Sequence, residues 1–173
     1  MNRAAVLERR IRFWTWVFIL GLVFSGATAI PLPAEVECLA RITGAQDLVA
    51  RPGPSPAPAW ATWLIQVQSA LGEMRERYPF IFYGGDWLAF GHFVIAIFFI
   101  GAVRDPVRNR WLFDAGIIAC LLVVPYAFLF GGFRGIPGWW RLIDCAFGVG
   151  GLLLLIPCKR WAGQLELMLR SGS

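Results

Sequence analysis

The stretch DWLAFGHFVIAIFFIG, residues 86–101, decides the fold of this chain. It is apolar over a length that can enter a membrane, yet it begins with an acid and contains the only histidine of the protein, His92. Further apolar runs follow at 111–130 and 139–156, and another precedes it at 13–30. Because about 20 apolar residues in a helix cross ~30 Å of hydrocarbon, the sequence predicts an all-α fold, a four-helix transmembrane bundle.

The composition also indicates a membrane protein. Hydrophobic residues make up 58% of the chain and charged residues 16%, which departs from the globular average in the membrane direction. The net charge of +5 follows from basic residues beside the spans, and no long basic run lies elsewhere, so we expect no nucleic-acid partner. Cys38, Cys120, Cys145 and Cys158 form no C-x-x-C pair. Since one short segment usually presents two sulfurs together, we expect no metal site and no cofactor.

Residues 13–30 allow two interpretations. An arginine pair before this run and the sequence ATA near its end are typical of a cleaved signal peptide. Small residues at Gly21, Ser25 and Ala29 would instead let a retained helix approach another helix closely in lipid. We expect a retained first span, with the signal peptide as the alternative.

Residues 31–85 separate the first span from the second, which we place at 86–103. We expect a short helix over 34–42 that ends at Gly44, followed by an amphipathic helix over 59–78. Apolar residues of the latter recur at helical spacing, opposite a face of Gln, Glu and Arg. This helix either lies in the membrane interface, which suits its tryptophans, or covers the bundle with its apolar face.

The two later connections are short. In the turn over 104–110 we expect Asp105 and Asn109 to supply turn and cap hydrogen bonds. Asp114 follows close behind, where an arginine of that turn can neutralise it. Pro157 should end the fourth span, leaving a short separate tail helix after it.

The distribution of basic residues predicts the orientation. The amino terminus holds four of the sixteen Lys and Arg, the 104–110 turn three and the carboxyl tail three. The much longer 31–85 segment holds four, balanced by five acids. Because short cytoplasmic loops are rich in Lys and Arg, we expect an inner (plasma) membrane protein with both termini in the cytoplasm and 31–85 outside.

Two ionisable residues inside the spans fall at matched depth. His92 follows Asp86 by six residues and Asp144 follows Gly138 by six, so each lies about 9 Å below the predicted start of its helix. An ionisable side chain that faces lipid is costly, so both should turn inward. We expect them to share a hydrogen bond, directly or through one water, as the candidate catalytic residues. The alternative for His92 is a histidine satisfied within the bundle.

Other polar residues lie at or just above this depth. The candidates for the lining of a ligand pocket are Tyr126, Ser25, Thr28, Arg141 and Asp86. Three of them also have a structural interpretation: Tyr126 can anchor the interface, Arg141 can form an ion pair with Asp144, and Asp86 can cap its helix.

Three stretches carry a resemblance: YPFIFYGGDWLAFGHFVIAI (78–97), RDPVRN (104–109) and IPGWWRLIDCAFG (136–148). They resemble a family of small bacterial four-helix integral membrane proteins with no assigned activity, over roughly residues 12–170. The resemblance implies a fold and no catalytic residue. In layout alone the chain is similar to the sterol-isomerase and sigma-2-receptor superfamily, but no motif aligns, so no residue role is transferred.

Three functions follow as hypotheses. The first is an accessory or structural subunit that contacts a membrane-protein partner or a second copy within the bilayer. The second is a binding protein or enzyme for a lipid-like molecule, in which His92 and Asp144 act as an acid–base pair at outer-leaflet depth. The third is ion or proton transport, which is weakened because the inner half of the spans offers little beyond Asp114.

Overall fold

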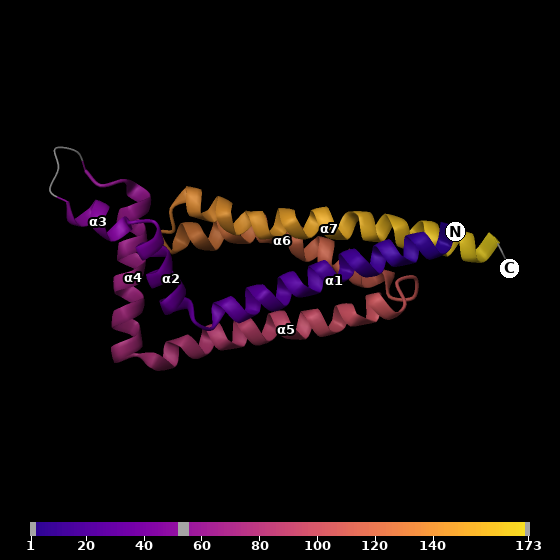
Figure 1. Cartoon of the computed structure of the whole chain (residues 1–173), viewed down its shortest axis with the longest axis horizontal. Coiled ribbons are helices and arrows are strands. Elements are labelled where there is room, and N and C mark those ends of the chain that lie inside the picture. The colour runs from indigo at the N-terminus through magenta and orange to yellow at the C-terminus, as the bar shows by residue number, and fades with distance from the viewer. Residues whose placement is uncertain (1–2, 52–55, 172–173) are drawn as a thin grey trace. The chain divides into compact units, whose positions relative to one another are not determined.

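The computed structural model describes residues 3–51 and 56–171, and every regular element within these ranges is a helix. In chain order the elements are α1 (Arg3–Ala29), α2 (Leu32–Ile42), α3 (Ala45–Ala50), α4 (Ala59–Arg77), the 3₁₀ helix η1 (Pro79–Ile81), α5 (Phe82–Arg104), α6 (Arg110–Phe133) and α7 (Gly138–Ser171) (Figure 1). Four of them, α1, α5 together with η1, α6 and α7, are long and apolar enough to cross a membrane. The predicted all-α class with four long apolar helices is confirmed.

Contacts divide the chain into two compact units. The first, which we call the long-helix unit, comprises residues 1–22 and 94–173. The second, the short-helix unit, comprises residues 23–93. Helices α1 and α5 each contribute one part to each unit, and each unit is described by itself below.

Four helices share one apolar core in the long-helix unit. Phe113 of α6 and Leu155 of α7 are fully buried, and the Phe18 and Phe99 rings of α1 and α5 lie 4.7 Å apart between centroids. The buried cluster comprises Ile11, Ile19, Ala96, Phe99, Ala102, Leu112, Phe113, Leu155, Cys158, Ala162 and Leu165. Since all four segments contribute, this core holds them together as one cluster of helices.

Small residues let α6 and α7 pack closely, side by side (Figure 1). A methyl group at Gly148 would lie 2.6 Å from the Cys120 carbonyl oxygen, and one at Gly151 would meet the Cys120 sulfur. On α6, a methyl group at Gly116 would lie 2.6 Å from Cδ1 of Leu155. At these three glycines only a hydrogen side chain fits, so the two helices and Leu155 can approach this closely.

The expected small-residue row of the first span is wrong at Gly21, where an added methyl group would touch nothing within 4 Å. The close approach lies instead at Gly26, in the short-helix unit. A methyl group there would lie 3.0 Å from both the Ala89 carbonyl oxygen and Cβ of His92. Spacing alone does not show which face of a small-residue helix meets its neighbour.

Pro157 does not end the last helix, contrary to prediction. Helix α7 continues through it to Ser171, so the expected tail helix is part of α7. An internal proline costs roughly 3 kcal/mol or more, but Cys158, Ala162 and Leu165 beyond it are buried in the core. Their packing holds the helix together past the proline. Pro125 likewise lies inside α6.

The turns at the ends of α5 and α6 are built from backbone and side-chain hydrogen bonds. Asn109 Nδ2 donates to the carbonyl oxygens of Gly101 and Asp105, each at 3.0 Å, while Asp105 Oδ1 accepts from the Arg108 N–H at 2.9 Å. The predicted turn chemistry is confirmed, although the Asn109 side chain closes the end of α5 and makes no capping hydrogen bond at the start of α6.

The end of α6 forms a Schellman motif. Gly135 has a left-handed φ of 69°, which favours glycine, and its N–H donates to the Gly132 carbonyl oxygen at 3.1 Å. The Ile136 N–H donates to the Gly131 carbonyl oxygen at 2.9 Å. The connection to α7 is therefore only residues 134–137.

In the short-helix unit, α4 packs against α2 and α3. The predicted helices at 34–42 and 59–78 are confirmed within two residues, and Gly44 follows the first with a φ of 66°. The prediction missed α3. The buried cluster comprises Val36, Ala40, Ala45, Ala61 and Leu64. The buried side chains of α4 are therefore covered by α2 and α3, an arrangement that neither predicted role of this helix included.

Candidate functional site

Tyr126 and Asp144, which the sequence places at similar depth, line one groove in the long-helix unit. The groove runs between α6 and α7, is open along one side and has a volume of about 640 Å³. Its lining comprises Ala119, Leu122, Val123, Tyr126, Ala127, Phe130, Gly131, Arg134, Ile136 and Asp144. The groove is therefore apolar apart from one carboxylate, one guanidinium and one phenol.

The charged groups of this groove are unpaired. Within residues 3–51 and 56–171, neither Asp144 nor Arg134 forms an ion pair through its side chain. The Tyr126 ring stacks on Phe130, with 4.4 Å between centroids, and 65% of the residue is exposed. Sequence analysis did not select Arg134, because the position was assigned to a loop. The helical repeat of α6 extended to residue 134 would have placed it on the face of Tyr126.

Arg141 holds the turn between α6 and α7. Its Nε donates to the Ile136 carbonyl oxygen at 2.9 Å, and its Nη1 donates to the Phe128 carbonyl oxygen at 3.4 Å. The side chain crosses Gly131, where a methyl group would lie 2.7 Å from Cδ. The alternative of an ion pair between Arg141 and Asp144 is not seen in the described part of the chain. Backbone carbonyl oxygens take that role for Arg141.

His92 lies in the short-helix unit, where its Nδ1 is 2.8 Å from the Leu88 carbonyl oxygen. A carbonyl oxygen only accepts, so Nδ1 carries the proton and donates to the turn below. Cβ of His92 packs against Gly26. Nearby on α1, the Thr28 hydroxyl donates to the Ser25 carbonyl oxygen at 3.1 Å. The hydrogen bonds of the His92 and Thr28 side chains are thus accepted by carbonyl oxygens of their own helices.

The structure does not bear out the equal distances predicted for His92 and Asp144 from the starts of their helices. Helix α5 begins at Phe82 and not at Asp86, so His92 lies about 15 Å from its helix start, against about 9 Å for Asp144. The two residues belong to different units, and their hydrogen bond stays a prediction.

Asp86 is not a helix cap, contrary to one of its two interpretations. It lies one turn inside α5, exposed, in a shallow hollow of about 250 Å³ with Tyr83, Trp87 and Phe90. The Trp87 ring meets its two aromatic neighbours edge-on, at 6.0 Å from Tyr83 and 5.5 Å from Phe90. Asp86 therefore lies beside three aromatic side chains of the same helix.

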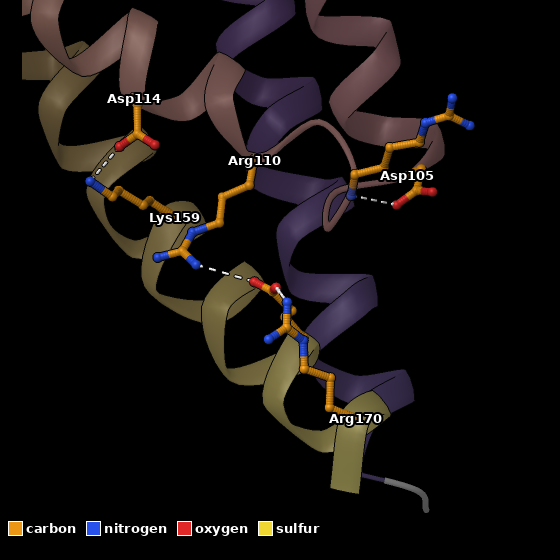
Figure 2. Close-up of polar contacts among 7 residues, drawn as sticks. Asp105, Arg110, Asp114, Lys159 and Arg170 are labelled. Carbon is orange, nitrogen blue, oxygen red and sulfur yellow. Dashed lines mark hydrogen bonds and ion pairs between the residues drawn. The ribbon is translucent and has the colours of Figure 1, made fainter. Parts of the chain in front are cut away.

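Ion pairs brace α6 and α7 near the end that carries the carboxyl terminus (Figure 2). Asp114 pairs with Lys159, and Arg110 pairs with Glu166 at 3.3 Å. Arg170 also pairs with Glu166, at 2.6 Å. The prediction that an arginine of the 104–110 turn neutralises Asp114 is wrong. Because α7 continues past Pro157, it brings Lys159 alongside α6. The sequence analysis ended the fourth span at Pro157 and therefore did not predict this pair.

The four long apolar helices place the chain, by length and composition, in the class of multi-pass membrane proteins. Comparison with protein-family models, with curated proteins and with solved structures finds no match. The function is therefore argued from the residues and surfaces of this chain itself.

Proposed function

We propose that the chain is a four-span integral protein of the inner (plasma) membrane, and that it acts as an accessory or structural subunit of a membrane assembly. The observation that carries this proposal is the unburied apolar surface of its helices. In the most apolar 18 residues of α6, only 11% are buried within the chain, against 22–28% in the other three helices. So large an apolar surface needs lipid or a protein partner around it.

One face of α6 is the best candidate for the surface that contacts this partner. Ile118, Leu121, Val124 and Phe128 are all exposed and recur at helical spacing. At 100° per residue, Leu121, Val124 and Phe128 lie about 140–160° around α6 from groove-lining Tyr126, and Ile118 lies at the edge of this face. We call these four residues the outer face of α6. Because α6 is held to α7 by glycine contacts and ion pairs, this face is presented on a rigid helix pair.

The orientation rests on the distribution of basic residues. Both termini and the 104–110 turn face the cytoplasm in this proposal, and residues 31–85 lie outside, since the short segments hold ten of the sixteen Lys and Arg. An even number of spans is consistent with both termini on one side. The resemblance to small bacterial membrane proteins implies that the outer compartment is the periplasm.

Site-specific photo-crosslinking in native membranes tests the subunit role. A photoreactive amino acid at Leu121, on the outer face of α6, should give a discrete protein adduct, from a partner or from a second copy. The same group at buried Phe113 should give none. If Leu121 yields no protein adduct and the detergent-solubilised chain purifies alone as a stable monomer, the proposal is wrong.

A further inference from the structure

The groove between α6 and α7 has its polar groups at one end. Arg134 lies just past the last residue of α6 and Ala119 lies near its middle, so the groove follows about 22 Å of helix. Gly148 packs beside Cys120 and Arg141 beside Gly131, which places Asp144 between these levels, near Tyr126. Beyond Tyr126, toward Ala119, the lining is entirely apolar.

The order along the groove is therefore a guanidinium, then a carboxylate with a phenol about 12 Å further along α6, then an apolar channel. Side chains on helices lean toward the helix amino terminus. Asp144 on α7 thus leans toward the level of Arg134, which follows α6, yet the two form no ion pair in the described residues. Asp144 lies inside a span, where charged groups normally have a partner, so we infer that a bound molecule supplies one to Asp144 and also contacts the exposed Arg134 at the end of the groove.

The geometry points to a single-chain phospholipid of the lysophospholipid class as that molecule. We propose that its phosphate binds Arg134, that its free glycerol hydroxyl donates to the Asp144 carboxylate, and that its acyl chain lies along Leu122, Val123 and Ala119. Guanidinium and phosphate form strong bidentate hydrogen bonds. A diacyl lipid has an ester in place of that hydroxyl, so its glycerol backbone cannot donate to a carboxylate.

The size of the groove suits a small molecule such as a lipid chain. Its volume of about 640 Å³ falls within the roughly 300–1,000 Å³ of small-molecule sites. This site lies opposite the outer face of α6, so it is independent of the proposed subunit role.

Lipid binding by the purified full chain in detergent tests the proposal. Native mass spectrometry would count bound molecules for three probes: palmitoyl lysophosphatidic acid, dipalmitoyl phosphatidic acid, which lacks the hydroxyl, and monopalmitoylglycerol, which lacks the phosphate. We expect one bound lysophosphatidic acid per chain, with an affinity at least about tenfold above either comparison probe, since each lacks one charge-assisted hydrogen bond.

Four variants assign the contacts. Asp144→Leu should abolish the preference over the diacyl probe only, and Arg134→Gln should abolish the preference over monopalmitoylglycerol only. Ala127→Trp fills the groove and should remove binding, whereas Leu121→Trp, on the outer face of α6, should leave it unchanged. A general loss of structure would not make the Asp144 and Arg134 variants each lose a different probe preference.

Two outcomes overturn the proposal. Equal binding of all three probes, unaffected by the variants, would mean that the groove holds only ordinary bilayer lipid. A dimer that binds no probe and dissociates with Ala127→Trp would assign the groove to a second copy of the chain. If Asp144→Leu does not purify, the three-probe comparison on the native chain together with Arg134→Gln still decides.

Discussion

The close approach of α7 to the backbone of α6 at Gly148 gives a prediction for which the chain also offers a matched control variant. A methyl group at Gly148 would lie 2.6 Å from the Cys120 carbonyl oxygen, whereas carbon and carbonyl oxygen normally approach to about 3.3–3.6 Å. The helices must therefore separate by roughly 0.7–1 Å in Gly148→Ala. Overpacking of this kind costs typically about 1–3 kcal/mol. Gly150→Ala meets nothing within 4 Å and should be neutral or gain up to about 1 kcal/mol of helix propensity.

A second substitution separates two kinds of contact with Cys120. The methyl group of Gly151→Ala would meet the Cys120 sulfur, whereas that of Gly148→Ala meets the Cys120 backbone oxygen. Cys120→Ala removes the sulfur and leaves the oxygen. It should therefore rescue Gly151→Ala by about 1–3 kcal/mol and should not rescue Gly148→Ala.

Reversible unfolding in mixed detergent micelles, followed by tryptophan fluorescence, measures these free energies. The six chains needed are the native chain, Gly148→Ala, Gly151→Ala, Cys120→Ala and the two double variants, with Gly150→Ala as the matched control. Equal stabilities of Gly148→Ala and Gly150→Ala would refute the close packing. Rescue of both glycine variants alike by Cys120→Ala would refute the distinction between the sulfur and the carbonyl oxygen.

Three further predictions concern the ion pairs and the turns. Asp114→Asn should lower the free energy of unfolding by no more than about 1 kcal/mol, and less at high salt, because its pair with Lys159 is about 40% exposed on both sides. Asn109→Ala removes two hydrogen bonds to backbone carbonyls and should cost about 1–3 kcal/mol in the same assay. Gly135→Ala puts a side chain at a φ of 69° and should cost about 1–2 kcal/mol.

Matched variants serve as controls for these three. Exchange of the two charges, Asp114→Lys with Lys159→Asp, should restore most of the loss, and no restoration would exclude an electrostatic origin. Asn109→Asp keeps the size but cannot donate, so it should be no more stable than Asn109→Ala. Gly138→Ala, where a methyl group meets nothing within 4 Å, should not share the cost of Gly135→Ala; equal costs would argue against backbone strain.

The helices of this chain could be predicted from the sequence, because length and hydropathy mark a long apolar helix without knowledge of its neighbours. Their ends were harder. The apolar run of α1 begins at Phe13, but an ion pair between Glu8 and Arg12 at 2.6 Å and the fully buried Ile11 extend the helix to Arg3. At Pro157, packing of residues further along outweighs the local penalty, which no local pattern reveals.

The candidate site was only partly accessible to sequence reasoning. The helical repeat and the antiparallel order of α6 and α7 place Tyr126 and Asp144 near one another, and they line one groove. The hydrogen-bond and ion-pair partners of the charged side chains could not be predicted from the hydropathy pattern. Arg141 bonds to backbone carbonyls of its own turn, and Asp114 meets Lys159 because α7 continues.

The central claim is that all four long helices cross a membrane, and labelling of single cysteines tests it most directly. Cys38 is exposed on α2, and the turn after α5 accepts a cysteine as Arg108→Cys in a chain whose other cysteines are replaced. In intact cells, a membrane-impermeant maleimide should label Cys38 and should reach the cysteine of Arg108→Cys only after permeabilisation. Labelling of both positions in intact cells would contradict the four-span account.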